Sequence, residues 1–247
     1  MTEGNEIGQM NKDRIVIIIP VYNHDKKVAQ LISEALNLHL PIIVVDDGST
    51  DSTYNRIMDI PSITVIRHDV NRGKGAAILT GFAAAAASAD WGVTMDADGQ
   101  HHPENVWDLI RAVPHGARPI VVGKREQMRH LNVPWKSRFG RSFSNFWVRR
   151  CGGPDIQDTQ SGFRLYPLPE AMHLNVTARR FQFEVEILVR AKWRRVPVLE
   201  TPIRVTYDAK DKRISHYRGF VDFFRNASTF SRLILIRIFV LPFTKVK

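Results

Sequence analysis

The chain has 247 residues, of which 44% are hydrophobic and 24% charged, as in an ordinary globular protein with a sizeable core. Its formal net charge of +10 indicates an anionic partner, such as nucleic acid, anionic lipid or a phosphorylated substrate. The single cysteine, Cys151, excludes an intrachain disulfide and suits a reducing compartment, and the lack of any 18-residue apolar run argues against a transmembrane helix.

Strands and helices alternate through the first half of the chain. Residues 1–13 are polar, contain no apolar core of a signal peptide and are expected to be flexible. Residues 14–23 form an unbroken apolar, β-branched run, which is typical of a strand buried on both faces of a parallel sheet. Residues 25–38 have the apolar spacing of an amphipathic helix. Further strands are predicted within residues 41–53, 63–67 and 91–101, with a helix cap at Ser49 or Ser52 and an alanine-rich helix that follows residues 71–77 and ends near residue 87.

The pattern is looser in the second half. It predicts a strand at residues 119–125, a basic and aromatic helical segment at 129–150, a helix at 180–191 and a pair of strands within 196–207. We find no repeats or low-complexity linkers, so one α/β domain is expected over residues 14–217, with a doubly wound, mostly parallel sheet. Residues 218–247 are a C-terminal appendage.

Acidic residues follow two of the predicted buried strands. Asp46 and Asp47 end the second strand, and Asp96 and Asp98 end the fourth. In parallel α/β sheets, ligands bind beyond the C-terminal ends of the strands. Neighbouring carboxylates there repel each other and are costly to desolvate, unless a divalent cation or a set of hydrogen-bond donors compensates them. Turn formation or helix capping is the alternative for each pair.

Four segments, with the sequences PVYN, VDDGSTD, NRGKGAA and DADGQH, carry a resemblance to a known family. They occupy residues 20–23, 45–51, 71–77 and 96–101. In this order and at this spacing they resemble the family 2 glycosyltransferases of the GT-A fold, and they look closest to the branch that glycosylates polyprenyl or dolichyl phosphate. The resemblance covers residues 14–207. It implies a nucleotide-sugar donor and a mostly parallel mixed sheet flanked by helices.

The resemblance implies donor-side roles at the strand ends. Lys74 and Arg125 would lie near the donor phosphates, with a solvated loop lysine and a surface arginine as the alternatives. A divalent cation, Mg²⁺ or Mn²⁺, would be held at the metal and diphosphate positions by Asp96, Asp98 and Gln100. The cradle for the base and ribose would consist of Pro20, Tyr22, Asn23, Asp46 and Asp47.

Residues 158–164 are implied on the acceptor side. In the polyprenyl-phosphate branch a similar segment supplies an acid beside the reacting centre, so Asp158 is the candidate that orients or deprotonates the acceptor. Asp158 and Asp98 are therefore the expected catalytic residues. Gln160 is expected to contact the acceptor, and Gly162 to permit a tight turn beside the site. An ordinary Asx turn is the alternative for Asp158.

Two helical segments supply further acceptor candidates. Arg138 and Ser142, four residues apart, share a helix face, and the resemblance places a similar pair near the acceptor phosphate. A solvated basic face is the alternative. Glu184 and Glu186, two residues apart, must point to different faces of their helix. Glu186 is expected to face the site, held by residues at helical spacing, with a surface salt bridge as the alternative.

The C-terminal segment, residues 218–247, combines apolar and basic residues at helical spacing. A basic amphipathic helix is typical of binding to a membrane surface, and packing onto the domain is the alternative. Membrane binding would bring the site beside a lipid-borne acceptor. The residues expected on the apolar face are Phe223, Phe224, Ala227, Phe230, Ser231, Ile234 and Ile238.

The resemblance therefore implies a metal-dependent glycosyltransferase that moves a sugar from a GDP- or UDP-sugar to a lipid-linked acceptor, and it implies that the anomeric configuration is inverted. Polyprenyl phosphate is the expected acceptor, and a glycan or lipid hydroxyl is the alternative. The protein is expected in the cytoplasm, peripheral on the inner face of the membrane, with no nucleic-acid partner. Two other classes remain open: a nucleotidyltransferase, although no glycine-rich loop follows the first strand, and a basic anion-binding protein without catalysis, which the acidic strand ends oppose.

Overall fold

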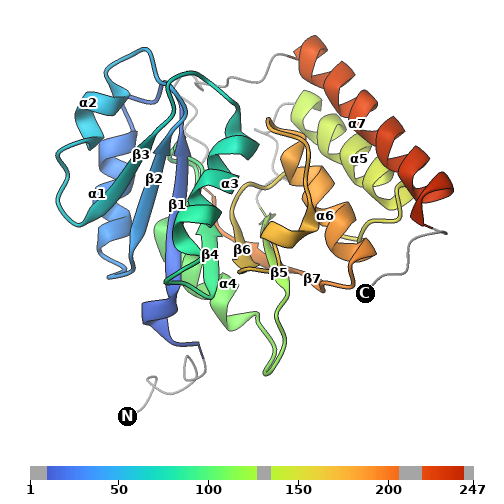
Figure 1. Cartoon of the computed structure of the whole chain (residues 1–247), viewed down its shortest axis with the longest axis horizontal. Helices are drawn as coiled ribbons and strands as arrows, with labels where there is room; N and C mark the ends of the chain where they lie inside the picture. Colours follow the sequence, from blue (N-terminus) through green and yellow to red (C-terminus); the bar gives the residue numbers. More distant parts are fainter. Residues whose placement is uncertain (1–9, 127–134, 206–218, 242–247) are drawn as a thin grey trace.

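A seven-stranded sheet forms the centre of the molecule, with helices on both faces (Figure 1). The computed structural model describes residues 10–126, 135–205 and 219–241. The strand order is β3-β2-β1-β4-β6-β5-β7, and every strand except β6 runs in the same direction. The strands are β1 (Ile15–Val21), β2 (Ile42–Asp46), β3 (Ile63–Arg67), β4 (Trp91–Thr94), β5 (Ile120–Arg125), β6 (Arg164–Pro167) and β7 (Val198–Ile203).

The helices form two layers against the sheet and a third layer outside one of them. One apolar cluster joins the sheet to α1, α2 and α4, and a second joins the opposite face to α3 and α6. A third cluster packs α5 and α7 onto α6, and the three helices lie together on one side in Figure 1. The helices are α1 (Val28–Leu36), α2 (Thr53–Ile57), α3 (Lys74–Ala85), α4 (Val106–Arg111), α5 (Trp135–Arg150), α6 (Phe183–Trp193) and α7 (Gly219–Phe239), with short 3-10 turns at Lys12–Arg14, Pro103–Asn105 and Met172–Leu174.

The sequence pattern explains the central strands. All seven residues of β1 and all five of β2 are buried, because helices cover both faces of the sheet. In α1 the buried side chains recur at helical spacing, at Val28, Leu31, Ile32 and Ala35. The predicted α/β class and mostly parallel sheet are therefore confirmed.

Several boundaries differ from the expectations. Helix α1 begins at Val28 rather than Asp25, and α6 spans Phe183–Trp193 rather than residues 180–191. Where a pair of strands was expected within residues 196–207, the described part, residues 196–205, contains the single strand β7 and an isolated bridge from Val205 to His101. Residues 129–134 of the predicted basic helix lie outside the described residues.

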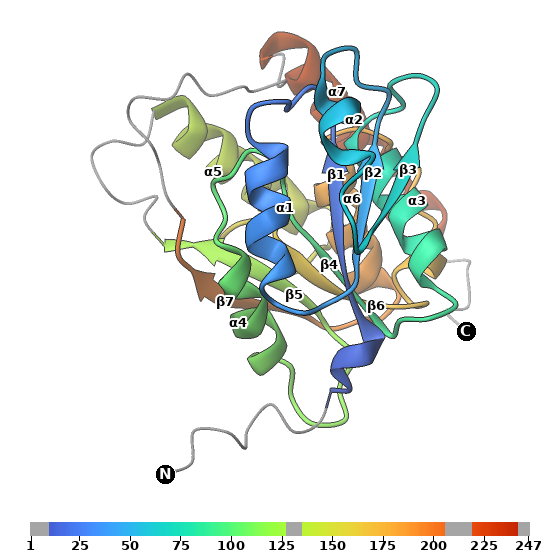
Figure 2. The ribbon, with the colours of Figure 1, turned by 90° about the vertical axis from the view of Figure 1, so that its left-hand side faces the viewer.

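Strand β6 was not predicted, and it determines the geometry of the site. It lies antiparallel between β4 and β5, with Arg164 opposite both Thr94 and Val122. Its first residue therefore lies at the sheet edge where β1, β2, β4 and β5 end, and the preceding 158–163 segment enters the sheet at that edge (Figure 2 shows β4, β5 and β6 side by side).

The C-terminal helix α7 packs onto the domain in its middle. Phe230 and Leu233 are buried against α5 and α6, whereas Ser231 and Ile238, both expected on the apolar face, are exposed. Of the predicted apolar face, Phe230 and Ile234 therefore pack against the domain and Ser231 and Ile238 do not, while the side chains of Phe223 and Phe224 lie outside the described part of the structure. Within the described ranges, no helix has both the length and the apolar character needed to cross a bilayer.

Candidate active site

Asp96 lies at the end of β4 in contact with a lysine from α3. Lys74 is the first residue of α3, and its Nζ lies 2.6 Å from Asp96 Oδ1. The same Nζ donates to Glu184 Oε1 at the start of α6. The Lys74 side chain is 15% exposed, which rules out a solvated loop lysine. Burial opposes its charge, but Asp96 and Glu184 together raise the pKa of Lys74, so the ammonium is retained.

Gly162 brings the backbone against this ion pair. A Cβ at Gly162 would lie 2.5 Å from Asp96 Oδ2 and 2.5 Å from Lys74 Nζ. The Gly162 carbonyl accepts a 2.7 Å hydrogen bond from Thr94 Oγ1 in β4. The sequence favoured glycine here for a tight turn, but the structure requires it for close approach to two charged groups.

Asp98 has the opposite electrostatics to Asp96. Burial raises the pKa of Asp98, and the charge of Asp96 raises it further. The side chain of Asp96 is 24% exposed. Desolvation opposes its charge, but Lys74 lowers the pKa of Asp96 below the usual value. Asp98 Oδ1 accepts a 3.0 Å hydrogen bond from the backbone N–H of Gln100. The loop therefore holds two carboxylates, only one of which is compensated by a cation.

His101 closes the loop behind Asp98. Its ring stacks on Phe163 with centroids 5.1 Å apart, and the side chain is 5% exposed. Burial lowers the pKa of His101 against the pull of Asp96 and Asp98, so the imidazole is neutral. Its buried Nδ1 makes no hydrogen bond to a described residue.

The Asp96–Asp98 loop fits a hard cation only if the substrate completes the coordination. Among the described residues, no group of three or more His, Cys, Asp or Glu side chains is placed to hold a metal ion. Two carboxylates are nevertheless the oxygen donors that Mg²⁺ prefers, and Mg²⁺ commonly takes its remaining ligands from water and substrate phosphates. The uncompensated charge near Asp98 also favours a cation there.

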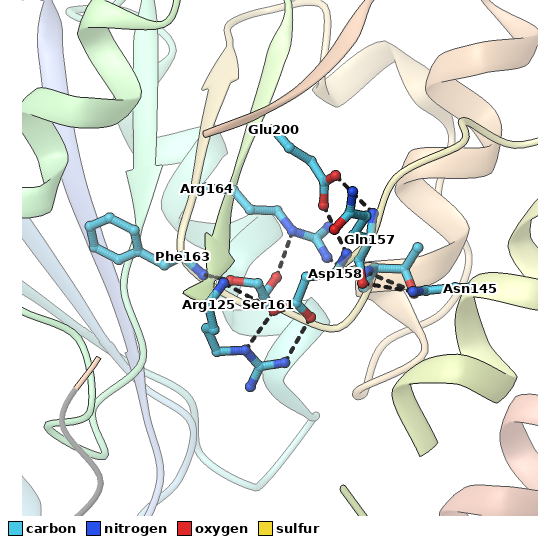
Figure 3. A network of polar contacts seen from close by, with 9 residues as sticks. Arg125, Asn145, Gln157, Asp158, Ser161, Phe163, Arg164 and Glu200 are labelled. Atoms are coloured by element: carbon cyan, nitrogen blue, oxygen red, sulfur yellow. Dashed lines mark hydrogen bonds and ion pairs between the residues drawn. The ribbon is translucent and has the colours of Figure 1, made fainter. Parts of the chain in front are cut away.

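Asp158 is held by Arg125 in a buried fork (Figure 3). Arg125 Nε lies 2.7 Å from Asp158 Oδ2 and Nη2 lies 2.8 Å from Oδ1. Asp158 is fully buried, and although burial opposes its charge, Arg125 lowers its pKa. Arg125 is therefore no plain surface arginine, and both Asp158 oxygens are engaged.

Neighbouring elements fix the backbone around Asp158. Glu200 in β7 accepts from the N–H groups of Gln157 and Asp158, each at 2.8 Å. Asn145 in α5 donates to the Gln157 carbonyl at 2.7 Å and accepts from Thr159 Oγ1 at 2.7 Å. The segment is thus attached to α5, β5 and β7, as Figure 3 shows.

Arg164 also stabilises the 158–163 segment, and the sequence analysis gave it no role. It is fully buried, and its guanidinium donates to the carbonyls of Ser161 (2.7 Å), Thr159 (2.9 Å) and Glu184 (2.8 Å). One side chain therefore connects the loop beside Asp96 to the first turn of α6. No local pattern marks this role, because its partners are backbone oxygens.

The acidic end of β2 differs from that of β4. Asp47 is 2% exposed and accepts hydrogen bonds from the N–H groups of Arg72 (2.9 Å) and Gly73 (2.7 Å) and from His68 Nδ1 (2.8 Å). Gly48 follows with φ +72°, and a Cβ there would meet the backbone of Val70 at 2.6 Å. Asp47 thus fixes the loop that leads to Lys74.

Asp46 has one oxygen that makes no hydrogen bond. Oδ1 accepts from the Ser49 N–H at 3.0 Å. Buried Oδ2 lies 3.2 Å from Arg67 Nε, an ion pair without the orientation of a hydrogen bond. This ion pair connects the end of β2 to β3.

The other cradle candidates have different surroundings. Pro20 is buried in β1 opposite Val45. Asn23 Oδ1 accepts from the Thr50 N–H at 2.8 Å, which joins the ends of β1 and β2. Tyr22 follows β1 and is partly exposed.

The two glutamates of α6 have exchanged their expected roles. Glu184 contacts Lys74 beside Asp96, whereas Glu186 points away, to Arg190 and Arg232. Two residues correspond to roughly 200° around a helix, so one carboxylate alone can reach the site. The expectation that Glu186 faces the site is therefore corrected to Glu184.

The remaining acceptor candidates lie on or near α5. Ser142 is exposed, and Gln160 Oε1 lies 4.0 Å from where a Cβ on Gly140 would stand. Arg138 belongs to the same helix, but its side chain lies outside the described part of the structure.

Comparisons with known proteins identify the kind of site. A family model described as glycosyl transferase family 2 matches residues 16–168, more than half of the chain. The UDP-N-acetylglucosamine–dolichyl-phosphate N-acetylglucosaminyltransferase of Methanococcus voltae is 30% identical over 215 residues, which cover 78% of this chain and 86% of that protein. The polyprenol monophosphomannose synthase of Mycolicibacterium smegmatis is 30% identical over 226 residues, covering 83% and 82%.

Among solved structures, mannosyl-3-phosphoglycerate synthase from Rubrobacter xylanophilus superposes with a TM-score of 0.61. The match covers 91% of this chain and 73% of that one at 16% sequence identity. At this identity the likeness shows the shared GT-A fold, and function has to be argued from the site.

Proposed function

Because the chain belongs to glycosyl transferase family 2, and is therefore a glycosyltransferase, we propose that it transfers a sugar from a nucleotide sugar to a polyprenyl-type phosphate. One relative described above is named for a dolichyl-phosphate acceptor, and the other for the lipid product polyprenol monophosphomannose. The observation that carries the proposal is the charge arrangement at the end of β4. The negative charge of Asp96 is paired with Lys74, whereas Asp98 has a raised pKa beside it. The Arg125–Asp158 ion pair lies on the other side of the loop that contains Gly162. Family membership sets aside the two other classes, a nucleotidyltransferase and a basic anion-binding protein without catalysis.

On the donor side, the ends of β1 and β2, with Tyr22, Asn23 and Asp46, would form the cradle for the nucleoside, and the loop held by Asp47 presents Lys74. Asp96 and Asp98 would hold the divalent cation, with the side chain of Gln100 as a further oxygen ligand. When bound, the cation supplies Lewis-acid stabilisation of the departing diphosphate. Lys74 and Arg125 contribute fixed positive charge that requires no reorganisation during the reaction.

In the reaction step, an acceptor oxygen attacks the anomeric carbon from the side opposite the diphosphate. The new bond forms as the carbon–oxygen bond to the donor breaks, and the leaving diphosphate keeps the electron pair. A single displacement of this kind inverts the anomeric configuration.

The Asp158 fork favours a phosphate acceptor over a hydroxyl. Asp158 is fully buried, and both oxygens bond to Arg125, so it is poorly placed to remove a proton. A phosphate monoester is already largely ionised at neutral pH and needs little base assistance. We therefore assign Asp158 to orienting Arg125, with Arg138, Ser142 and Gln160 as acceptor contacts.

The exposed end of α7 suits the surface of a membrane. Leu235, Ile238 and Phe239 have helical spacing and are 55%, 55% and 64% exposed, and Val240 follows at 46%. An apolar end on a helix of a strongly basic chain is suited to an anionic lipid surface. The protein would then work as a peripheral enzyme on the reducing, cytoplasmic side, where the free thiol of Cys151 persists.

The first experiment measures thermal unfolding with GDP-, UDP- and dTDP-sugars, with and without Mn²⁺. A donor present at about a hundred times its Kd should stabilise the fold by about 2.7 kcal/mol. A shift that requires both the metal and one nucleotide supports the proposal and identifies the base. No shift with any combination contradicts it.

The second experiment separates the acceptors. With the donor so identified, transfer is compared between a polyprenyl phosphate and the corresponding polyprenol. We expect transfer to the phosphate and release of the nucleoside diphosphate. Equal transfer to the polyprenol would overturn the assigned acceptor, and release of pyrophosphate would overturn the reaction type.

A further inference from the structure

Glu186 joins three segments of the chain through one buried carboxylate. It lies on α6 and is fully buried. Its oxygens accept from the N–H groups of Thr177 (3.2 Å) and Ala178 (2.9 Å), from Arg190 Nε (2.6 Å) and from Arg232 Nη2 (2.6 Å). Arg232 comes from α7 and also donates to Thr177 Oγ1. The C-terminal helix therefore has a charged contact with α6 and with the segment that precedes it.

The carboxylate of Glu186 is ionised. Burial alone would raise its pKa, but Arg190, the Ala178 N–H and Arg232 together lower it. A buried ion pair generally adds little to stability compared with apolar packing, while removal of one partner is costly. The network is therefore better explained as a device that fixes how α7 docks than as a source of stability.

The segment that Glu186 holds, residues 177–180, contacts the first turn of α3. The carbonyl of Arg179 accepts a 2.9 Å hydrogen bond from the Ala76 N–H. Arg180 Nη1 donates to Asn71 Oδ1 at 3.0 Å. A Cβ on Gly73 would lie 2.5 Å from the Arg179 carbonyl oxygen. The backbone on either side of Lys74 thus rests against residues 179–180.

We propose that Arg232 is a positioning residue for Lys74. Arg232 fixes Glu186 and Thr177, these fix the Thr177–Arg180 segment, and that segment fixes the turn from which Lys74 reaches Asp96. Docking of the C-terminal helix thereby sets the charge arrangement at the end of β4. The structural part of the inference stands on the contacts alone, and its catalytic consequence rests on the proposed glycosyl transfer.

Hydrogen exchange of the full chain tests the structural part. We compare the wild type with Arg232→Ala and with Arg237→Ala. Arg237 docks the same helix by a 2.6 Å bond to the Arg150 carbonyl on α5, and it does not touch Glu186. Arg232→Ala should speed exchange at the amides of Thr177, Ala178 and Ala76 at least about tenfold, because each is hydrogen-bonded along the route.

Arg237→Ala should leave these three amides unchanged. An equal effect of both variants, or an effect of Arg232→Ala confined to α7, would overturn the inference. If Arg232→Ala does not fold, Arg232→Lys is measured in the same way. It keeps the charge but loses the fork that reaches Glu186 and Thr177 together, and the same outcomes decide.

Kinetics test the catalytic consequence separately. Arg232→Ala should lower kcat about tenfold or more with a smaller change in the donor KM, Arg232→Lys should recover part of the loss, and Arg237→Ala should match the wild type. If the wild type transfers sugar and Arg232→Ala turns over like Arg237→Ala, Arg232 does not position Lys74. If the wild type transfers no sugar, the proposed function fails while the exchange result still decides the coupling.

Discussion

Two strands of the same sheet end in paired aspartates, and the two pairs serve different purposes. At β2, Asp47 is saturated by two backbone N–H groups and a histidine, and Asp46 keeps one buried oxygen without a hydrogen bond. At β4, Asp96 is compensated by Lys74, and Asp98 carries a raised pKa beside it. An aspartate therefore has a structural role where backbone N–H groups surround it, and a role in ligand binding where another carboxylate lies beside it.

The difference has a physical cause. A carboxylate that accepts several N–H bonds is stabilised in its charged form by groups that cannot leave. A carboxylate beside another one is destabilised until a cation arrives. The Asp96–Asp98 pair therefore lowers the stability of the unliganded protein and raises its affinity for a cation, whereas Asp46 and Asp47 do neither.

The largest expected effect comes from Asp98→Asn. Turnover should fall about 10³-fold, on the order of 4 kcal/mol, because the variant removes a ligand of the cation. The folded-state pKa of Asp98 is raised, so its favourable contribution to folding is present at low pH and is lost as pH rises through that pKa. The unliganded variant should therefore be at least as stable as the wild type at pH 7.

Steady-state kinetics and thermal unfolding measure both effects, and chelation of the metal should likewise abolish turnover. The control is Asp108→Asn, which removes a surface carboxylate paired with Arg111. Wild-type turnover in Asp98→Asn would contradict the metal assignment.

The next largest effect is expected for Asp158→Asn, which leaves Arg125 beside a neutral partner in a buried site. The free energy of unfolding at pH 7 should fall by about 3 kcal/mol. Because the pKa of Asp158 is lowered in the folded state, its contribution is complete above the unfolded pKa and is lost as pH falls through the folded value.

The stability difference between Asp158→Asn and the wild type should therefore shrink on acidification. Urea unfolding from pH 7 towards pH 3 measures it. Asp155→Asn is the matched control, because Asp155 is 81% exposed and its pair with Arg149 should contribute little. A constant difference at every pH would show that the charge of Asp158 is not responsible.

Asp47→Asn tests whether the aspartates at the end of β2 have a structural role, in contrast to Asp98 at the end of β4. An amide in place of Asp47 directs N–H groups at backbone donors, so the protein should lose about 2 kcal/mol of stability. Turnover per folded molecule should fall much less than in Asp98→Asn. Chemical denaturation and active-site-normalised kinetics measure the two quantities. A large loss of turnover at full stability would place Asp47 among the ligand-binding residues instead.

The smallest expected effect is that of Gly162→Ala. The new methyl group would meet Asp96 and Lys74 at 2.5 Å, so the ion pair must shift, and we expect about a tenfold loss of kcat. Gly140→Ala in α5 is the control, because a Cβ there meets its nearest neighbour at 4.0 Å and alanine favours a helix. Equal activity of the two variants would show that the close approach at Gly162 has no catalytic role.

Sequence reasoning recovered the parallel sheet and its acidic strand ends, because both are local patterns. The apolar run of β1 and the Asp96–Asp98 spacing are visible in a few consecutive residues. Strand β6 was missed because it is short and begins with a buried charge, Arg164, whose partners are carbonyl oxygens from other segments.

What the sequence alone determined is the α/β class, the family resemblance and the edge of the sheet at which the chemistry lies. Only the tertiary structure decided which carboxylates form ion pairs, and with which lysine or arginine side chains. Lys74 and Glu184 are 110 residues apart, and Arg125 and Asp158 are 33 apart. The pKa of a carboxylate depends on its burial and on the charges a few ångströms away, and these are set by packing between distant segments.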